Sequence, residues 1–161
     1  MVRSFAIISI LSLMAATASG ETPNKLQGVW KIVEVKTSGP NASTDSSPQP
    51  GMFFFAAKHY SFIRIFGQAP RPDLPADLTK ATASELYAVW NPFGANAGTY
   101  EVTGDKMTCH PAIAKNPSVM ANGAKVVATF KLEGNSLWIT TVSTVAGPAK
   151  DPETLKLVRL E

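Results

Sequence analysis

The chain has 161 residues, 45% of them hydrophobic, and its 15 basic and 12 acidic residues give a formal net charge of +3. This length suits a single domain with a single core. The small, evenly spread charge argues against binding to nucleic acid or to an anionic membrane surface. Cys109 is the only cysteine, which excludes an intramolecular disulfide, and His59 and His110 are the only histidines. Because these three residues do not form a zinc-like ligand set, we expect no metal and no other cofactor.

The first 20 residues have the pattern of a secretory signal peptide. Arg3 forms a short positively charged N-terminal region, an apolar run covers residues 5–16, and small residues follow to Gly20. This run is shorter than the roughly 20 residues that span a bilayer, so we expect no stable membrane insertion after cleavage. Cleavage after Ala18 or Gly20 would leave a mature domain over residues 21–161, exported to the periplasm or the extracellular space. Without Arg3, 14 basic residues face 12 acidic ones, a formal charge of +2.

The mature chain opens with a predicted strand over residues 26–36. Side chains alternate between the two faces of a strand, so Trp30, Ile32 and Glu34 fall on one side if the strand is regular. Both faces are partly apolar, which favours a closed or strongly curved sheet. Glu34 then either lies inside the barrel, where a buried carboxylate needs a partner such as Arg64, or lies outside past the end of the barrel.

Aromatic residues dominate the next two predicted strands, 52–56 and 59–66. In the second of these, Arg64 shares a face with Tyr60, Phe62 and Phe66. After a proline-rich connector, helical spacing over residues 78–90 predicts one short helix. It follows the third predicted strand and precedes the fourth. A single helix among strands is expected to lie across the sheet or to cap one end of a barrel.

The rest of the chain predicts five more strands, which brings the total to eight. Two tight turns, Thr103-Gly104-Asp105 and Glu133-Gly134-Asn135, have the composition of hairpin links. The resulting fold class is mainly β, an eight-stranded, mostly antiparallel up-and-down barrel with one short helix between strands 3 and 4. The five additional strands are predicted at residues 98–102, 106–112, 125–133, 137–144 and 154–160.

A series of motifs covers nearly the whole mature chain in a fixed order. The chain thereby resembles the lipocalin-like domain family of bacterial proteins, within the calycin group. This resemblance implies a barrel that binds a small apolar molecule, and a few barrels of similar fold act as cyclases or isomerases. The motifs are Leu26-x-Gly28-x-Trp30, Pro50-Gly51-Met52, Arg71-Pro72, Ala97-Gly98-Thr99-Tyr100-Glu101-Val102, Asn116-Pro117, Phe130-x-Leu132-Glu133-Gly134-Asn135-x-Leu137 and Leu157-Val158-Arg159.

The chain also departs from the family pattern. Asn96 stands where relatives often carry a tyrosine, and Cys109, His110 and Ala112 stand where they tend to carry a His-His pair and a glutamate. A role that depends on that set would be incomplete in this chain. Trp30 and Arg159 resemble the pair that many lipocalins stack at the closed end of the barrel, so we expect them to be structural.

His110 is the first acid/base candidate, because its pKa naturally lies near neutrality. It can bind a ligand if the Thr108/His110 face lines the cavity, whereas it is an ordinary surface histidine if the opposite face does. Glu34 and Arg64 are the other catalytic candidates. Amphipathic aromatic residues complete the predicted ligand-binding set. That set consists of Tyr60, Arg64, Tyr87, Trp90, Tyr100 and His110.

The sequence therefore favours an exported protein that binds a small, largely apolar molecule in a barrel cavity. One alternative is a small-molecule cyclase or isomerase in which Glu34, Arg64 or His110 handles protons. A second alternative is an interaction module with a filled barrel. The sequence fixes neither the ligand nor the oligomeric state.

Overall fold

The computed structural model describes residues 24–121 and 123–161, and the predicted signal peptide lies outside them. Most of the described chain is in strands, with two short 3₁₀ helices and one α-helix. The strands are β1 (Gly28–Thr37), β2 (Ser43–Asp45), β3 (Gly51–Phe55), β4 (His59–Ile65), β5 (Phe93–Thr103), β6 (Lys106–Ala114), β7 (Val126–Glu133), β8 (Ser136–Thr144), β9 (Gly147–Pro148) and β10 (Glu153–Arg159), and the helices are η1 (Leu78–Lys80), α1 (Ala83–Trp90) and η2 (Pro117–Met120).

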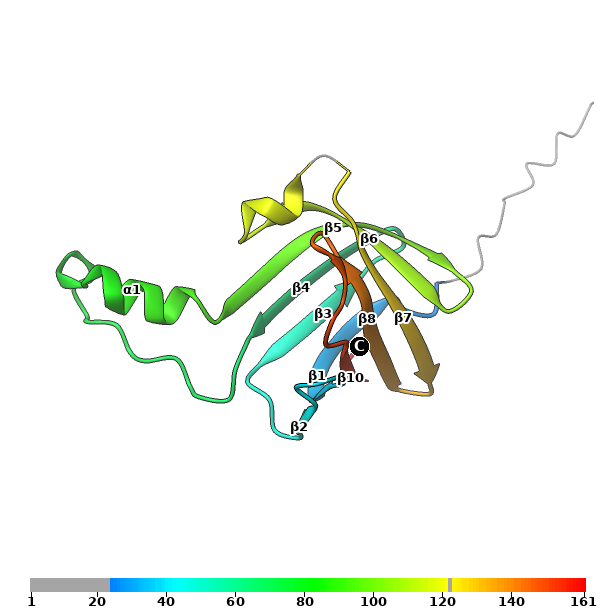
Figure 1. Cartoon of the computed structure of the whole chain (residues 1–161), viewed down its shortest axis with the longest axis horizontal. Coiled ribbons are helices and arrows are strands. Elements are labelled where there is room, and N and C mark those ends of the chain that lie inside the picture. The colour runs from blue at the N-terminus through cyan, green and yellow to red at the C-terminus, as the bar shows by residue number, and fades with distance from the viewer. Residues whose placement is uncertain (1–23, 122) are drawn as a thin grey trace, which may run out of the picture.

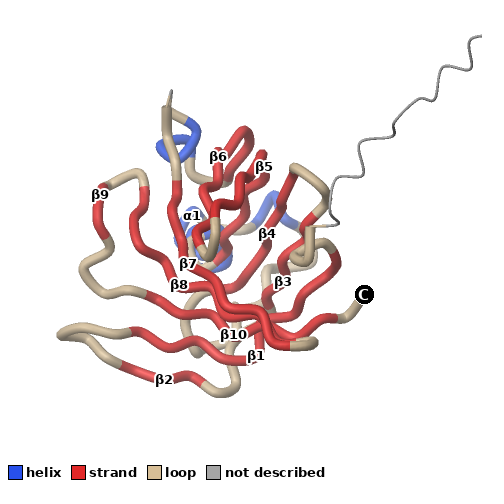
Figure 2. The backbone as a smooth tube through the Cα atoms, turned by 90° about the vertical axis from the view of Figure 1, so that its right-hand side faces the viewer, coloured by secondary structure: helices blue, strands red, loops and turns tan. Residues whose placement is uncertain are grey.

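Eight of the strands form a closed antiparallel barrel, in the order β1, β3, β4, β5, β6, β7, β8 and β10 (Figure 1). The barrel closes because β10 pairs with β1 on one side and with β8 on the other, as Figure 2 shows. The short strands β2 and β9 extend the sheet beside β1 and β8. The predicted fold class, a mainly β, eight-stranded antiparallel barrel, is confirmed.

Hairpin turns connect neighbouring strands at the two predicted positions. Gly104 follows Thr103, the last residue of β5, and Gly134 follows Glu133, the last residue of β7. Both glycines have positive φ, 63° and 56°, a conformation that a side chain would strain. Because such short turns fix the pairing of the strands they join, they help to set the register of the barrel.

The helix lies between β4 and β5 rather than between the third and fourth strands. The difference arises because the loop after β1 forms an additional strand, β2, which the sequence did not predict. The predicted helical stretch 78–90 is also divided into η1 and α1. Thr82 starts α1 with a capping box, in which its hydroxyl accepts from the Glu85 amide at 3.2 Å and its own amide donates to the Glu85 carboxylate at 2.7 Å.

Helix α1 does not cover the barrel. None of its residues is buried, and Figure 1 shows it projecting beyond β4 and β5, away from the other strands. Lys115, just after β6, donates hydrogen bonds to the backbone carbonyls of Trp90 and Asn91 at the end of the helix. Within the described ranges, no helix is long and apolar enough to cross a membrane.

A break in register in β1 decides which way Glu34 points. Ile32 pairs with Leu157, whereas Glu34 pairs with Lys156, so Val33 is an extra residue and the alternation shifts by one position. Val35 therefore packs against the core in place of Glu34. The regular alternation that placed Glu34 on the face of Trp30 and Ile32 is wrong, because this bulge moves Glu34 to the outer face.

The core is densest at the end of the barrel near the start of β1, which we call the closed end. Four side chains are essentially inaccessible there, and the Trp30 indole NH donates to the Leu26 carbonyl at 2.8 Å. The Tyr100 hydroxyl donates to the Ala56 carbonyl at 2.8 Å and accepts from the Asn24 side-chain Nδ2 at 2.6 Å. The inaccessible side chains belong to Leu26, Trp30, Leu137 and Leu157.

Candidate functional site

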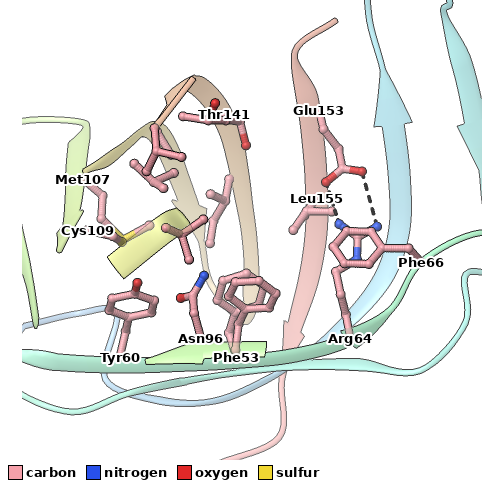
Figure 3. Close-up of a pocket in the computed structure, with 17 residues that line it drawn as sticks. Phe53, Tyr60, Arg64, Phe66, Asn96, Met107, Cys109, Thr141, Glu153 and Leu155 are labelled. Carbon is pink, nitrogen blue, oxygen red and sulfur yellow. Dashed lines mark hydrogen bonds and ion pairs between the residues drawn. The ribbon is translucent and has the colours of Figure 1, made fainter. Parts of the chain in front are cut away.

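The opposite half of the barrel contains a cavity of about 360 Å³, shown in Figure 3. This volume lies within the range of natural small-molecule sites, which is roughly 300 to 1,000 Å³. Alternation along each strand turns one residue in two towards the interior, so the wall is built from the inner faces of several strands. Its apolar surface includes Phe53, Phe62, Met107, Ala128, Ile139 and Leu155.

An ion pair lies across the mouth of the cavity. The Arg64 guanidinium donates to both carboxylate oxygens of Glu153, at 2.6 and 3.3 Å (Figure 3). Arg64 is on β4 and Glu153 is on β10, and β1 and β3 separate these strands in the sheet, so the pair links two strands that are not neighbours. Only 7% of Arg64 is exposed. A bidentate pair of this kind fixes both side chains and leaves the mouth with no net charge.

The ring of Phe66 packs against this ion pair. The Arg64 Cζ atom lies 4.3 Å from the ring centroid, which is cation–π geometry. The ring occupies space next to Gly94 at the start of β5, where a Cβ atom would overlap it. A glycine at position 94 therefore allows Phe66 to fold over the mouth. Together, Phe66, Arg64 and Glu153 form what we call the mouth cluster.

Deeper in the cavity, the wall carries a small polar spot formed by Tyr60 and Asn96. Asn96 pairs directly with Phe62 across β4 and β5, so it faces the interior together with Tyr60 and Phe62. Figure 3 shows the Asn96 carboxamide and the Tyr60 ring projecting from the same part of the wall. The Asn96 Oδ1 atom is buried and has no hydrogen-bond partner among the described residues.

Burial keeps the titratable groups of the deep cavity neutral near pH 7. It raises the pKa of the Cys109 thiol to about 12. It also raises the pKa of Tyr60 well above its ordinary value, and the nearby Cys109 adds a smaller upward contribution. Both groups therefore remain protonated, and the deep cavity presents neutral hydrogen-bonding atoms rather than a charge. Within residues 24–121 and 123–161, no three His, Cys, Asp or Glu side chains are grouped to hold a metal.

The structure brings two of the predicted ligand-binding residues, Tyr60 and Arg64, into the cavity wall. Tyr100 is buried at the closed end, where its hydroxyl is already hydrogen bonded and its ring meets Phe55 edge-on at 5.2 Å. Tyr87 and Trp90 are 64% and 55% exposed on α1, outside the cavity. With His110 on the outer face of β6, the predicted set is divided among four places.

The other two acid/base candidates do not line the cavity. The face of β6 that turns inward carries Met107 and Cys109, so the opposite face carries His110. His110 is half-buried in the outer wall. Glu34 faces outward because of the bulge in β1, and Arg64 pairs with Glu153 instead.

Trp30 and Arg159 lie together at the closed end. They pair directly between β1 and β10, and the Arg159 Cζ atom lies 4.0 Å from the centroid of the Trp30 ring. Arg159 also donates to the backbone carbonyls of Gln27 and, at 2.8 Å, of Lys25. This side chain therefore ties the last strand to the segment that enters the first one.

Two polar residues of the cavity, Asn96 and Glu153, were not among the predicted site residues. The predicted strands began at residues 98 and 154, one or two positions too late to include them. The sequence did contain a signal: Glu153 alternates with Leu155 and Leu157 on the inner face of β10. Extending that alternation backwards by one residue would have placed a carboxylate inside the barrel.

The structure is similar to the crystal structure of a lipocalin-like protein from Bacteroides uniformis, with 11% sequence identity and a TM-score of 0.46. The similarity covers 84% of this chain and 98% of that one. No protein-family model matches the sequence, and no curated protein matches it.

Proposed function

We propose that the protein is an exported binding protein that holds a small, largely apolar molecule inside its barrel. The observation that carries this proposal is the cavity of about 360 Å³ with its mainly apolar wall. Burial of apolar surface is the main driving force for such binding, and the few polar groups orient the ligand. An interaction module with a filled barrel does not fit an interior that contains a cavity of this size.

The alternative of an enzyme lacks a supporting arrangement of residues. Proton transfer requires an acid or base that changes its protonation state near the working pH. Of the candidates, only Arg64 lines the cavity, and a guanidinium keeps its proton in proteins. The raised pKa values of Tyr60 and Cys109 keep these groups protonated as well. For these three groups, the cavity wall therefore supports binding better than proton transfer.

Titration with the fluorescent probe N-phenyl-1-naphthylamine tests the proposal. We expect saturable binding by the wild type and a large loss of affinity in Ala128→Phe, because Ala128 is 4% exposed and lines the cavity. The matched control is Ala57→Phe, which adds the same ring in the exposed turn between β3 and β4. Equal binding by all three proteins would show that the probe does not occupy the barrel.

Export is proposed from the pattern of residues 1–20 alone. Sequencing the N-terminus of the protein recovered from its native host tests it. A mature chain that begins at Ser19 or Glu21 supports cleavage and export. A chain that retains Arg3 in a cytoplasmic fraction would contradict the proposal.

A further inference from the structure

The polar atoms of the cavity restrict the chemistry of the molecule that it can hold. The charged residues of the wall are Arg64 and Glu153, and they neutralise each other at 2.6 Å. The deep polar spot is neutral because Tyr60 and Cys109 keep their protons. The wall therefore offers hydrogen bonds but no uncompensated charge.

Asn96 indicates that a polar group of the ligand belongs in the deep part of the cavity. A buried carbonyl oxygen without a partner is costly, and folded proteins rarely leave one unsatisfied without a reason. The carboxamide can turn about its last torsion to present either its oxygen or its NH₂ group to the cavity. A ligand group that both donates and accepts hydrogen bonds satisfies either orientation.

Tyr60 is the second group at this spot. It lies two positions from Phe62 on β4, and Phe62 is directly opposite Asn96, so Tyr60 and Asn96 are diagonal neighbours on the inner face. Such neighbours have Cα atoms roughly 7 to 8 Å apart, close enough for both to contact one hydroxyl group. Within residues 24–121 and 123–161, no group forms a hydrogen bond with the Tyr60 hydroxyl, which is therefore available to the ligand.

An anionic head group has no suitable place in this cavity. Burying a carboxylate requires a cation that is free to pair with it. Arg64 already donates to both oxygens of Glu153 and stacks on Phe66, and the Glu153 carboxylate would repel a second anion at the mouth. The mouth cluster thus holds its cation in a neutral pair.

We propose that the cavity selects neutral amphiphiles that carry a hydroxyl-type group, held by Asn96 and Tyr60, and discriminates against carboxylates of the same size. This inference rests on the proposed binding function and specifies the class of ligand. Glu153 acts as the specificity residue, because its carboxylate occupies the guanidinium that an anionic ligand would need.

Competition between decan-1-ol and decanoate for the N-phenyl-1-naphthylamine site tests the inference at about pH 7. The two competitors share one chain length and differ in charge. We expect the alcohol to displace the probe at a concentration at least roughly tenfold lower than the carboxylate, the equivalent of an unpaired charge that costs a little over 1 kcal/mol. Equal or stronger displacement by decanoate would overturn the inference while leaving the binding function intact. Failure of the probe and both competitors to bind would overturn the binding function itself.

Two variants locate the selectivity at the mouth cluster. Glu153→Gln leaves Arg64 with an uncompensated charge, so we expect decanoate to bind about tenfold more tightly than it binds the wild type. The control is Glu133→Gln, which removes the same charge from an exposed pair with Lys131 on β7. The double variant Arg64→Gln/Glu153→Gln should restore the preference for the alcohol. Unchanged selectivity in Glu153→Gln would contradict the role of this residue.

A third variant tests the deep polar spot with 2-naphthol and naphthalene, which differ by one hydroxyl group. Asn96→Leu should weaken 2-naphthol binding roughly tenfold, the equivalent of one lost hydrogen bond, and should leave naphthalene binding nearly unchanged. Equal losses for both molecules would show that position 96 acts only through its shape. Unchanged binding of both would show that the hydroxyl group lies elsewhere.

Discussion

The two ends of the barrel differ in how their interiors are packed. At the closed end, large side chains fill the interior, and polar groups such as the Trp30 indole and the Tyr100 hydroxyl find partners within the chain. At the open end, the interior keeps a cavity, and the buried Asn96 Oδ1 atom finds none among the described residues. One end therefore carries features that stabilise the fold, and the other carries the unfilled space and the unpartnered polar atom on which the proposed binding function rests.

This difference separates a well-packed end of the sheet from an end that contains a cavity. Neighbouring positions on the same strands contribute to both ends: Phe55 belongs to the closed end and Phe53 to the cavity wall. Unfilled space and unsatisfied polar atoms both lower the stability of a protein. Their concentration at one end is the feature that the following substitutions test.

The largest expected effect is at the closed end. Leu137→Ala removes a side chain with 0% exposure, and we expect it to lower the free energy of unfolding by about 2 to 5 kcal/mol. Urea denaturation measures this change. The control is Val142→Ala on the same strand, where the side chain is 43% exposed and the expected loss is small. Equal losses would mean that the closed end is not the stabilising core.

At the open end, we expect Asn96→Leu to stabilise the protein, in contrast to the destabilising Leu137→Ala. Replacing the unpartnered carboxamide by an apolar side chain of similar size should raise the free energy of unfolding of the empty protein by about 1 to 3 kcal/mol. Asn96→Asp, which buries a charge at the same place, should lower it near pH 7. Thermal and urea unfolding of both variants check this contrast. A stability loss in Asn96→Leu as large as that in Asn96→Asp would contradict it.

Alkaline pH should weaken the fold through the buried thiol of the cavity wall. The pKa of Cys109 is about 12 in the folded protein against an ordinary value of 9.0, so unfolding releases its proton once the pH exceeds 9.0. The stabilisation is complete below this pH and is lost as the pH rises towards 12, by about 1.4 kcal/mol per pH unit for one group.

Urea unfolding from about pH 8 to about pH 10 measures this dependence. Cys109→Val removes the titrating group, so the free energy of unfolding should depend less on pH in the first pH unit above 9.0. Above that range, Tyr100 adds a similar loss, because burial raises its pKa to about 12. Identical pH curves for the wild type and Cys109→Val would show that the thiol does not contribute.

The smallest expected effect comes from removing one hydroxyl group at each end. Tyr100→Phe removes the hydrogen bonds to Asn24 and Ala56, and we expect it to lower the free energy of unfolding by about 0.5 to 1.5 kcal/mol. Tyr60→Phe should leave stability nearly unchanged and should instead weaken the binding of 2-naphthol. If Tyr60→Phe destabilised the protein as much as Tyr100→Phe, the hydroxyl at position 60 would have a structural role.

The sequence predicted the barrel because its local signals agree with its fold. Alternating apolar residues gave the eight strands, and the glycines at 104 and 134 gave two of the turns. The bulge at Val33 escaped prediction because it depends on pairing with β10, far along the chain. That single insertion reversed the orientation of Glu34 and removed it from the interior.

The site was harder to predict than the fold for a related reason. Arg64 was recognised as a charged residue among aromatic ones, but its partner Glu153 is 89 positions away and meets it only when the barrel closes. Glu153 is the first residue of β10 and Asn96 lies in the first half of β5, and both fell outside the predicted strands because strand boundaries are the least certain part of such a prediction. The amphipathic residues Tyr87 and Trp90 suited a pocket, yet α1 projects away from the barrel.

Native mass spectrometry of the protein purified from its own host tests the central claim most directly. We predict a species whose mass exceeds that of the mature chain by one small neutral molecule, and we predict that this species is lost in Ala128→Phe and kept in Ala57→Phe. A wild-type protein that carries no such molecule, and that also fails to bind N-phenyl-1-naphthylamine, would contradict the claim that this barrel is a binding site.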